Sequence, residues 1–494
     1  MANKSLAYTA SEIDVGISKT KKITVSQDVD LDLPDQTVLG RVTGGDIGAL
    51  TLAQLRVLVN GTGAEIYGVS WGGVENPIMT RTDDSIGMVA NAGVDGNYVV
   101  NNFDNAQIFK EIHDVTDTLG NEFVRIPKFY IKKTANKATT QISKFQHAGF
   151  YLPWCFWDFT NSRELSYVDI GKHKATKDGA SKLQSIPNVY PLVSTNIVDF
   201  RTYAQNNNVG GLSGYQQLDL SVEDVLQTLI TVEFATLDSQ SIMAGFTTGQ
   251  YSDTHTATVD ENAVNRIVVV NATAALYEVG QTISIGTSLG GNQIFYGRTI
   301  TSIDDYDASN KAISFDGATV NIAIGNILYN TGWKNGFSSS ILASSGSLVS
   351  NSTGKYPCMY RGIESPWGDL WQLVDGVNIT DNQAWVTPNA EDYASNVFAD
   401  PYSELGYVNH NANGYPTTMG YDSTYPYAEF PTAVGGDTST YYSDYYYQAA
   451  GARIALFGGN WYDGTLAGLF AWHLDSTSSL TYIRLGARLV KKPL

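Results

Sequence analysis

The chain has 494 residues, of which 43% are hydrophobic and 12% aromatic, so we expect several buried cores and no disordered chain. Its net charge of -18 argues against nucleic-acid binding, because contact with phosphates needs clustered Lys and Arg. Only 16% of the residues are charged, whereas Tyr (30) and Gly (47) are abundant, a composition typical of binding loops.

Residues 1–63 are predicted to form an attachment and oligomerisation segment. Hydrophobic and polar residues alternate over residues 25–33, which is typical of a half-exposed strand. Thr51 and Gln54 have the spacing of a capping box, and the short helix it opens needs other elements or copies of itself to cover its apolar face. The N-terminus lacks the apolar core of a signal peptide, and no long apolar run occurs. Synthesis in the cytoplasm without membrane insertion is therefore expected.

Residues 64–235 have the pattern of a mixed unit of strands and helices. Dense β-branched and aromatic residues predict strands over residues 66–69 and 123–131. Hydrophobic residues at helical spacing predict two helices, which begin at Thr195 and Ser221.

Residues 236–335 change character and predict a small all-β barrel or sandwich. Short hydrophobic stretches at 266–270, 281–285 and 312–315 are separated by Gly, Asn and Asp, as strands between turns are. Small barrels are mostly filled by their own side chains, so a spacer role is favoured for this insertion.

Residues 336–494 are aromatic and rich in Gly, with almost no helical periodicity. Eleven tyrosines lie from Tyr402 to Tyr447, and strands are predicted over residues 452–457 and 484–490. Long irregular stretches in a compact unit are usually functional or disordered, and this density of tyrosine argues against disorder.

The motifs that could support catalysis or metal binding are weak. Two Gly-x-Ser-x-Gly stretches centre on Ser70 and Ser288, but both run into further glycines and not into the helix that a nucleophile elbow requires. The histidines lack zinc-site spacing. Cys155 and Cys358 lie far apart among apolar neighbours, which favours buried free thiols. We therefore expect no enzyme, no metal and no cofactor.

Four segments carry a resemblance to known families. Residues 67–84 resemble the opening of phage tail-fibre and minor structural proteins, residues 362–376 resemble the central signature of that group, and residues 40–45 resemble its adaptor. Residues 452–489 are similar to the C-terminal part of C-type-lectin-like domains of the formylglycine-generating-enzyme type, which include target-binding proteins diversified by phage retroelements. The oxidase cysteines and the calcium–sugar tripeptides of these relatives have no counterpart here.

The resemblance implies an α+β fold: a C-type-lectin-like domain made of residues 64–235 and 336–494, with the small all-β insertion between them and a short N-terminal adaptor. It implies that Gly458, Gly459, Trp461, Trp367, Trp371 and Arg488 maintain the fold, while polar and aromatic positions between them bind the ligand. Tyr445 and Tyr447 are added from the preceding tyrosine cluster. The implied ligand-binding residues are Tyr445, Tyr447, Asn460, Tyr462, Asp463, Thr465, His473, Asp475, Thr477, Ser479 and Tyr482.

The function implied is that of a receptor-binding protein in the tail fibre of a virion, whose partner is a bacterial surface receptor, either protein or glycan. Other tail proteins would bind through the N-terminus of a homotrimer, and the C-terminus would be a target of retroelement diversification. One alternative is a purely structural tail or baseplate subunit. A second is an envelope glycan depolymerase, although such spikes are usually repetitive β-helices and this chain shows no internal repeat.

Overall fold

The structure is a computed structural model that describes residues 38–40, 48–50 and 65–494. The first two ranges are the antiparallel strands β1 (Val38–Gly40) and β2 (Gly48–Leu50). The strand predicted over residues 25–33 and the helix predicted from Thr51 lie outside the described residues.

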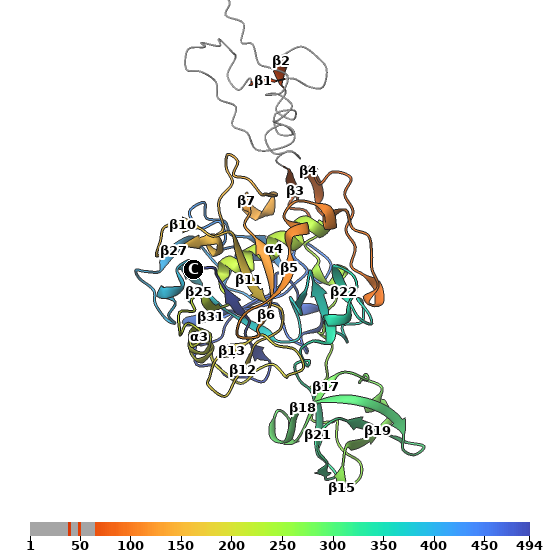
Figure 1. Cartoon of the computed structure of the whole chain (residues 1–494). Coiled ribbons are helices and arrows are strands. Elements are labelled where there is room, and N and C mark those ends of the chain that lie inside the picture. The colour runs from red at the N-terminus through yellow and green to blue at the C-terminus, as the bar shows by residue number, and fades with distance from the viewer. Residues whose placement is uncertain (1–37, 41–47, 51–64) are drawn as a thin grey trace, which may run out of the picture.

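The described chain is rich in sheet, with 35% of the residues in strands and 13% in helices. Figure 1 shows a large body that contains most of the sheets and the longest helix, with a smaller all-β unit below it. None of the helices among the described residues has the length and apolar character needed to cross a bilayer.

Helix α4 (Leu220–Phe234) runs through the centre of the body, and all its residues except the last are buried. It begins one residue before the predicted start, because the Asp219 side chain accepts a hydrogen bond from the Val222 amide at 2.9 Å and caps the helix. It ends where Ala235 adopts a left-handed conformation. Helix α3 (Ile197–Gln205) begins after Asn196, next to the predicted start.

A five-stranded sheet joins the C-terminal strand to the first half of the body. Its order is β14 (Tyr215–Gln217), β34 (Leu489–Lys491), β11 (Tyr167–Gly171), β6 (Glu122–Pro127) and β5 (His113–Thr116). A four-stranded sheet consists of β4 (Thr80–Asp83), β3 (Ile66–Ser70), β8 (Thr139–Ser143) and β7 (Tyr130–Lys133). The single strand predicted over residues 123–131 is therefore two strands, β6 and β7, which lie in different sheets.

A seven-stranded sheet forms the C-terminal part of the body. Its strands are β27 (Ser403–Val408), β26 (Gln383–Val386), β25 (Trp371–Thr380), β31 (Ala452–Phe457), β32 (Trp472–Leu474) and β30 (Tyr446–Gln448), with β33 (Leu485–Gly486) parallel to β25. The strand predicted over residues 452–457 is confirmed. The strand predicted over residues 484–490 is instead divided between β33 and β34.

The small unit below the body has its own hydrophobic core, which begins at Ala257 and ends at Leu328. Its strands are β15 (Glu261–Val264), β16 (Arg266–Val270), β17 (Thr282–Ser288), β18 (Gly291–Asp305), β19 (Asn310–Phe315), β20 (Val320–Ile322) and β21 (Ile327–Asn330), and it contains α6 (Asn271–Ala274). Helix α5 (Ser239–Ile242), which the sequence placed in this unit, packs on the body, because the Gln240 side-chain amide donates to the Gly464 carbonyl at 2.9 Å.

Shorter elements complete the body. Its remaining strands are β9 (Trp157–Asp158), β10 (Arg163–Glu164), β12 (Thr176–Lys177), β13 (Leu183–Gln184), β22 (Ser345–Ser347), β23 (Cys358–Tyr360), β24 (Ile363–Glu364), β28 (Pro416–Met419) and β29 (Pro431–Val434). Its 3-10 turns are Val94–Gly96, Asn102–Asn105, Phe109–Glu111, Ala135–Lys137, Trp154–Phe156, Phe337–Ser340, Ala390–Asp392 and Gly464–Leu466.

Both cysteines are free and buried, as predicted. Burial raises the pKa of the Cys155 thiol and raises the pKa of Cys358 to about 12, so both remain thiols at neutral pH.

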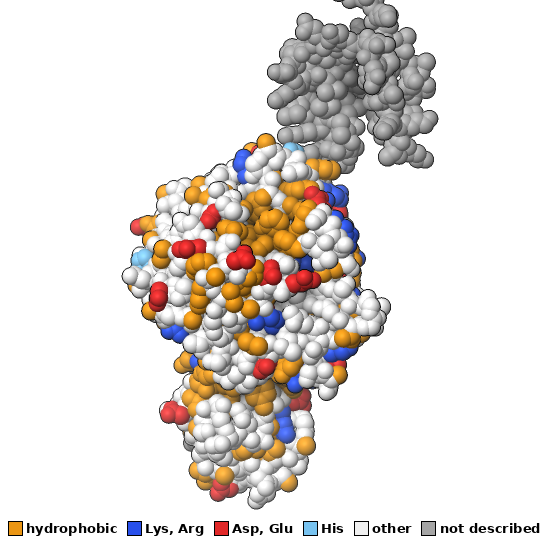
Figure 2. Space-filling view, turned by 90° about the vertical axis from the view of Figure 1, so that its left-hand side faces the viewer, with side chains coloured by type: hydrophobic (Ala, Val, Ile, Leu, Met, Phe, Trp, Pro, Cys, Tyr) orange, Lys and Arg blue, Asp and Glu red, His pale blue; other side chains and the backbone are white. Residues whose placement is uncertain are grey.

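One face of the body is mostly uncharged. Figure 2 shows hydrophobic side chains gathered in its upper part, with scattered acidic side chains around them. This agrees with a surface that contains few charges.

Candidate functional site

Aromatic side chains line the outer side of β30 and β32. Tyr446 points inward and is fully buried, so its neighbours Tyr445 and Tyr447 lie on the opposite, partly exposed side. The ring centroids of Tyr445 and Tyr447 are 4.8 Å apart, and Tyr447 lies 4.7 Å from the ring of His473. Tyr415 meets Tyr445 edge-on at 5.0 Å. We call Tyr415, Tyr445, Tyr447 and His473 the aromatic band, whose contacts fix each ring in place.

A second group of aromatic residues surrounds Arg484. The guanidinium lies 4.7 Å from the ring of Tyr482 and 5.3–5.8 Å from those of Tyr251, Tyr462 and Trp461. It also donates to the Tyr482 hydroxyl at 2.7 Å. Tyr462 is 48% exposed. We call Arg484, Tyr251, Trp461, Tyr462 and Tyr482 the arginine cluster. In this cluster the positive charge of Arg484 attracts the surrounding aromatic rings and fixes their positions.

Asp463 follows Tyr462 on the same loop. Its carboxylate accepts hydrogen bonds from the amide and the side chain of Asn460, at 2.9 and 2.7 Å. Burial raises the pKa of Asp463, although the Asn460 bonds and the charges of Arg484 and His473 oppose the rise. The loop that carries Tyr462 and Asp463 also reaches the aromatic band, because the Tyr445 amide donates to the Leu466 carbonyl at 3.0 Å. We call the aromatic band, Asp463 and the arginine cluster together the aromatic face.

His473 and Asp475 form an ion pair when the histidine is protonated, with 2.5 Å between Nδ1 and Oδ1. Burial alone would raise the pKa of Asp475, but the hydrogen bond and charge of His473 outweigh it and lower that pKa. The pair thus supplies a polar group beside the rings of the band.

The other predicted residues lie around this surface. Thr465 is exposed and lies on the same loop as Tyr462 and Asp463. Thr477 and Ser479 are exposed on the loop after β32, with 3.2 Å between their hydroxyl oxygens. Asn460 differs from the rest, because it is only 2% exposed and its side chain is engaged within its own loop. It is better described as a residue that positions Asp463 than as one that contacts a ligand.

Sequence reasoning missed three members of the face. Tyr415 belongs to the tyrosine-rich stretch, but its spacing from Tyr445 gives no sign that the two rings meet. Arg484 lies within a predicted strand, where a solvated charge is the default interpretation. Tyr251 is far away in the sequence, and its position beside Tyr462 follows from the path of the chain into the insertion. No local signal identifies it.

Glycine and tryptophan residues hold the aromatic face from beneath, as predicted. Gly458 and Gly459 have φ of 92° and 80°, values that L side chains rarely adopt. A Cβ on Gly459 would lie 2.3 Å from that of Ala467. Trp461 is fully buried and packs with Phe246 and other residues in a core cluster of its own. The glycine and tryptophan residues beneath the aromatic face are therefore close-packed, whereas the side chains of the face above them are partly exposed.

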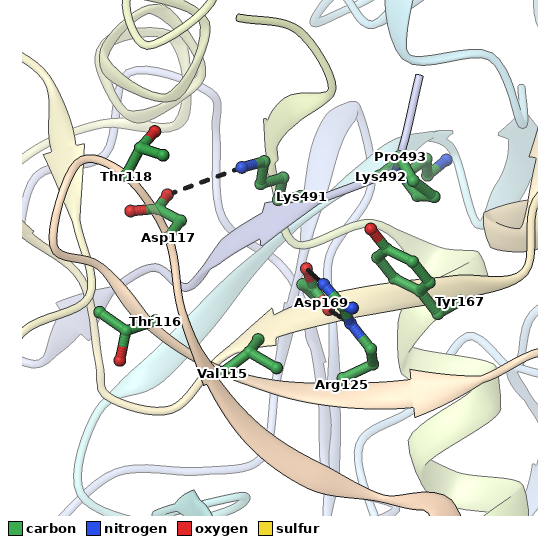
Figure 3. Close-up of a pocket in the computed structure, with 10 residues that line it drawn as sticks. All are labelled: Val115, Thr116, Asp117, Thr118, Arg125, Tyr167, Asp169, Lys491, Lys492 and Pro493. Carbon is green, nitrogen blue, oxygen red and sulfur yellow. Dashed lines mark hydrogen bonds and ion pairs between the residues drawn. The ribbon is translucent and has the colours of Figure 1, made fainter.

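A small pocket of about 170 Å³ lies on the five-stranded sheet near the C-terminal end. Figure 3 shows that its charged groups face one another. Arg125 binds Asp169 through two hydrogen bonds of 2.7 and 2.8 Å and stacks 3.5 Å from the ring of Tyr167. Lys491 lies 3.9 Å from Asp117. These charges neutralise each other, so the pocket offers little to a ligand.

The described residues contain neither a metal-binding cluster nor a nucleophile elbow. Within residues 65–494 and the two short strands before them, no group of His, Cys, Asp and Glu is arranged to hold a metal ion. Ser70 ends β3 and Ser288 ends β17, and no helix follows directly in either case. Neither serine thus lies on a strand-to-helix elbow.

No known family model matches the chain, and no curated protein matches it significantly.

Proposed function

We propose that this chain is the receptor-binding protein of a phage tail fibre and adheres to a bacterial surface receptor through its aromatic face. The observation that supports the proposal is the aromatic face, in which one loop joins the aromatic band to Asp463 and the arginine cluster. Tyrosine has few rotatable bonds, so rings fixed by their neighbours lose little entropy when they contact a partner. Such rings with small polar groups between them suit binding better than catalysis.

The fold that we propose for the body is C-type-lectin-like, with a small all-β insertion. The sheet-rich composition is compatible with it. The antiparallel pairing of C-terminal β34 with β11 and β14 also supports the joining of residues 64–235 and 336–494 into one body.

In this proposal the N-terminal segment attaches a homotrimer to other tail proteins of the virion. Three faces on one fibre, and several fibres on one particle, multiply modest contacts into firm adhesion. No catalytic group is needed for that task, and the C-terminal residues around the scaffold are those that a diversifying retroelement would alter.

Whole-cell binding tests the proposal. The full-length chain, labelled with a fluorophore, is incubated with a panel of bacterial species and with protein-free lipid vesicles. Adhesion predicts saturable binding to at least one species, competition by unlabelled chain, and no binding to vesicles. The same face would serve subunit contacts in a structural tail protein, so light scattering of a Tyr447→Ser and Tyr462→Ser double variant is the companion measurement. An unchanged oligomeric state supports adhesion, and dissociation supports the structural alternative.

A further inference from the structure

The loop that follows β4 carries an unusual number of exposed hydrophobic side chains. Figure 1 shows this loop, in orange, leaving β4 and running down the side of the body toward β22. Single exposed hydrophobic residues are normal on a protein surface, whereas a group of them marks a surface that contacts a partner. The members of the group are each 54% to 78% exposed, and we call them the apolar patch: Ile86, Val89, Val94, Tyr98, Val100 and, beside the loop, Leu342.

The body holds the backbone of this loop in place. The Gly93 amide donates to the Ser345 carbonyl at 2.6 Å, and the Leu342 amide donates to the Gly96 carbonyl at 2.8 Å. A Cβ on Gly93 would lie 2.3 Å from that of Ala343, so only glycine permits this close approach. The apolar patch is therefore presented to the surroundings on a fixed backbone.

The N-terminal segment joins the body at the edge of the apolar patch. The Ile66 amide donates to the Asp84 carboxylate at 2.7 Å, and the Asp84 amide donates to the Ile66 carbonyl at 2.9 Å. Glu65 thus lies beside Asp84, which is two residues before Ile86 in the sequence. Because residues 60–64 can span at most about 18 Å, the residues that precede them are held within reach of the patch.

The sequence just before this link has a surface that matches the patch. The helix predicted from Thr51, which lies outside the described residues, has one apolar face that needs a cover. Arg56 is the only charged residue from 51 to 64, and Asp95 is the only charged residue from 85 to 103. Both surfaces are thus apolar, and their single charges are opposite in sign. The residues of the predicted apolar face are Leu52, Leu55, Leu58 and Val59.

We propose that residues 52–59 pack their apolar face on the apolar patch of the same chain. A short link gives the two surfaces an effective concentration of about millimolar, which favours contact within one chain over contact between copies. The contact holds the body at one angle to its attachment segment. It makes no use of the aromatic face, so the inference goes beyond the proposed receptor-binding role and does not depend on it.

Trypsin cleavage of the full-length chain after Arg56 tests the contact, with mass spectrometry to follow the fragment that begins at Val57. Val100→Asp places a charge in the patch at a side chain that is 78% exposed, so the melting temperature should not change. We expect cleavage to become about tenfold faster, because a lost apolar contact and a desolvated charge both weaken the docking of residues 52–59. Val279→Asp is the matched control, since Val279 is 53% exposed on the insertion, and it should leave the rate unchanged.

A chemical cross-link measures the same contact without a change of charge. Leu55→Cys is combined with Val100→Cys in one protein and with Val279→Cys in a control, and both are treated with a short bismaleimide. The native thiols of Cys155 and Cys358 are buried and do not interfere. The Val100 pair should cross-link within one chain at least about fivefold more than the Val279 pair. If Val100→Asp also lowers the melting temperature, this cross-link decides.

Three results would overturn the inference. The first is the same rate of cleavage after Arg56 for Val100→Asp, Val279→Asp and the unaltered chain. The second is equal cross-linking of the two cysteine pairs. The third is cross-linking of the Val100 pair between chains, with cleavage of the unaltered chain that slows as its concentration rises, because a second copy would then cover the patch. Cell adhesion by Val100→Asp reports separately on the aromatic face.

Discussion

Arg488 is a guanidinium buried where three sheet segments meet, and it is only 1% exposed. All five of its N–H groups have acceptors at 2.7–3.2 Å. The acceptors are the side-chain oxygen of Gln372 and the carbonyl oxygens of Gly171, Lys172, Glu364 and Ser365. Burial lowers the pKa of Arg488 to about 10, so it stays charged at neutral pH.

Arg488→Lys keeps the charge but replaces the planar fork with a single ammonium. Three donors on one nitrogen cannot reach five acceptors arranged around a guanidinium, so at least two acceptors lose their partner. An unpaired buried polar group costs about 1–3 kcal/mol. We therefore expect the free energy of unfolding to fall by about 2–6 kcal/mol.

Urea unfolding followed by tryptophan fluorescence measures this loss. Arg163→Lys is the matched control, because the Arg163 side chain is 52% exposed and a lysine keeps the positive charge beside Asp158, so its loss should stay below about 1 kcal/mol. A loss for Arg488→Lys no greater than that of the control would refute the assignment of Arg488 as the link between sheets.

Three other outcomes are expected. Gly459→Ala should destabilise the fold by about 1–3 kcal/mol, because the added Cβ would meet Ala467. A Cβ added at Gly464 in the same loop would have no neighbour within 4 Å, so Gly464→Ala should lower the melting temperature less. Burial raises the pKa of Asp369 to about 7, although the charge of Lys174 opposes the rise. The raised pKa of Asp369 therefore contributes stability that is complete below its ordinary pKa of 3.8 and is lost as the pH rises through 7. Asp369→Asn should therefore flatten the fall in melting temperature over that interval, and an unchanged pH profile would contradict this. Cys155 and Cys358 should be unreactive to a thiol reagent in the native protein and should both react in urea, whereas fast native labelling would show an open core.

Elements with strong local patterns could be predicted from the sequence. The strand at residues 452–457 and the start of the central helix α4 were found to within one residue, because β-branched and aromatic residues mark the strand and hydrophobic periodicity marks the helix. Residues 484–490 show the limit of that reasoning. Their β character is real, but only long-range pairing sends β33 to one sheet and β34 to another. The local sequence of a strand does not show which other strand it will pair with.

Tyr445 and Tyr447 were chosen from the density of tyrosines alone, and no strand was predicted at that point. The structure shows that they flank the buried Tyr446, because the side chains of a strand alternate. Asn460 was taken for a ligand contact, although an Asn three residues before an Asp often forms local hydrogen bonds, as it does here.

The proposal that this chain is an adhesin depends most directly on the affinity of the full-length chain for the bacterial species that it binds. Tyr447→Ser and Tyr462→Ser remove one ring from each half of the aromatic face, and Tyr306→Ser removes an exposed ring from the insertion. We expect each face variant to weaken cell binding by about tenfold or more, as loss of an interface tyrosine does, while the insertion variant binds within about twofold of the unaltered chain. Equal binding by all four proteins, or equal losses for all three variants, would contradict a role of the aromatic face in adhesion.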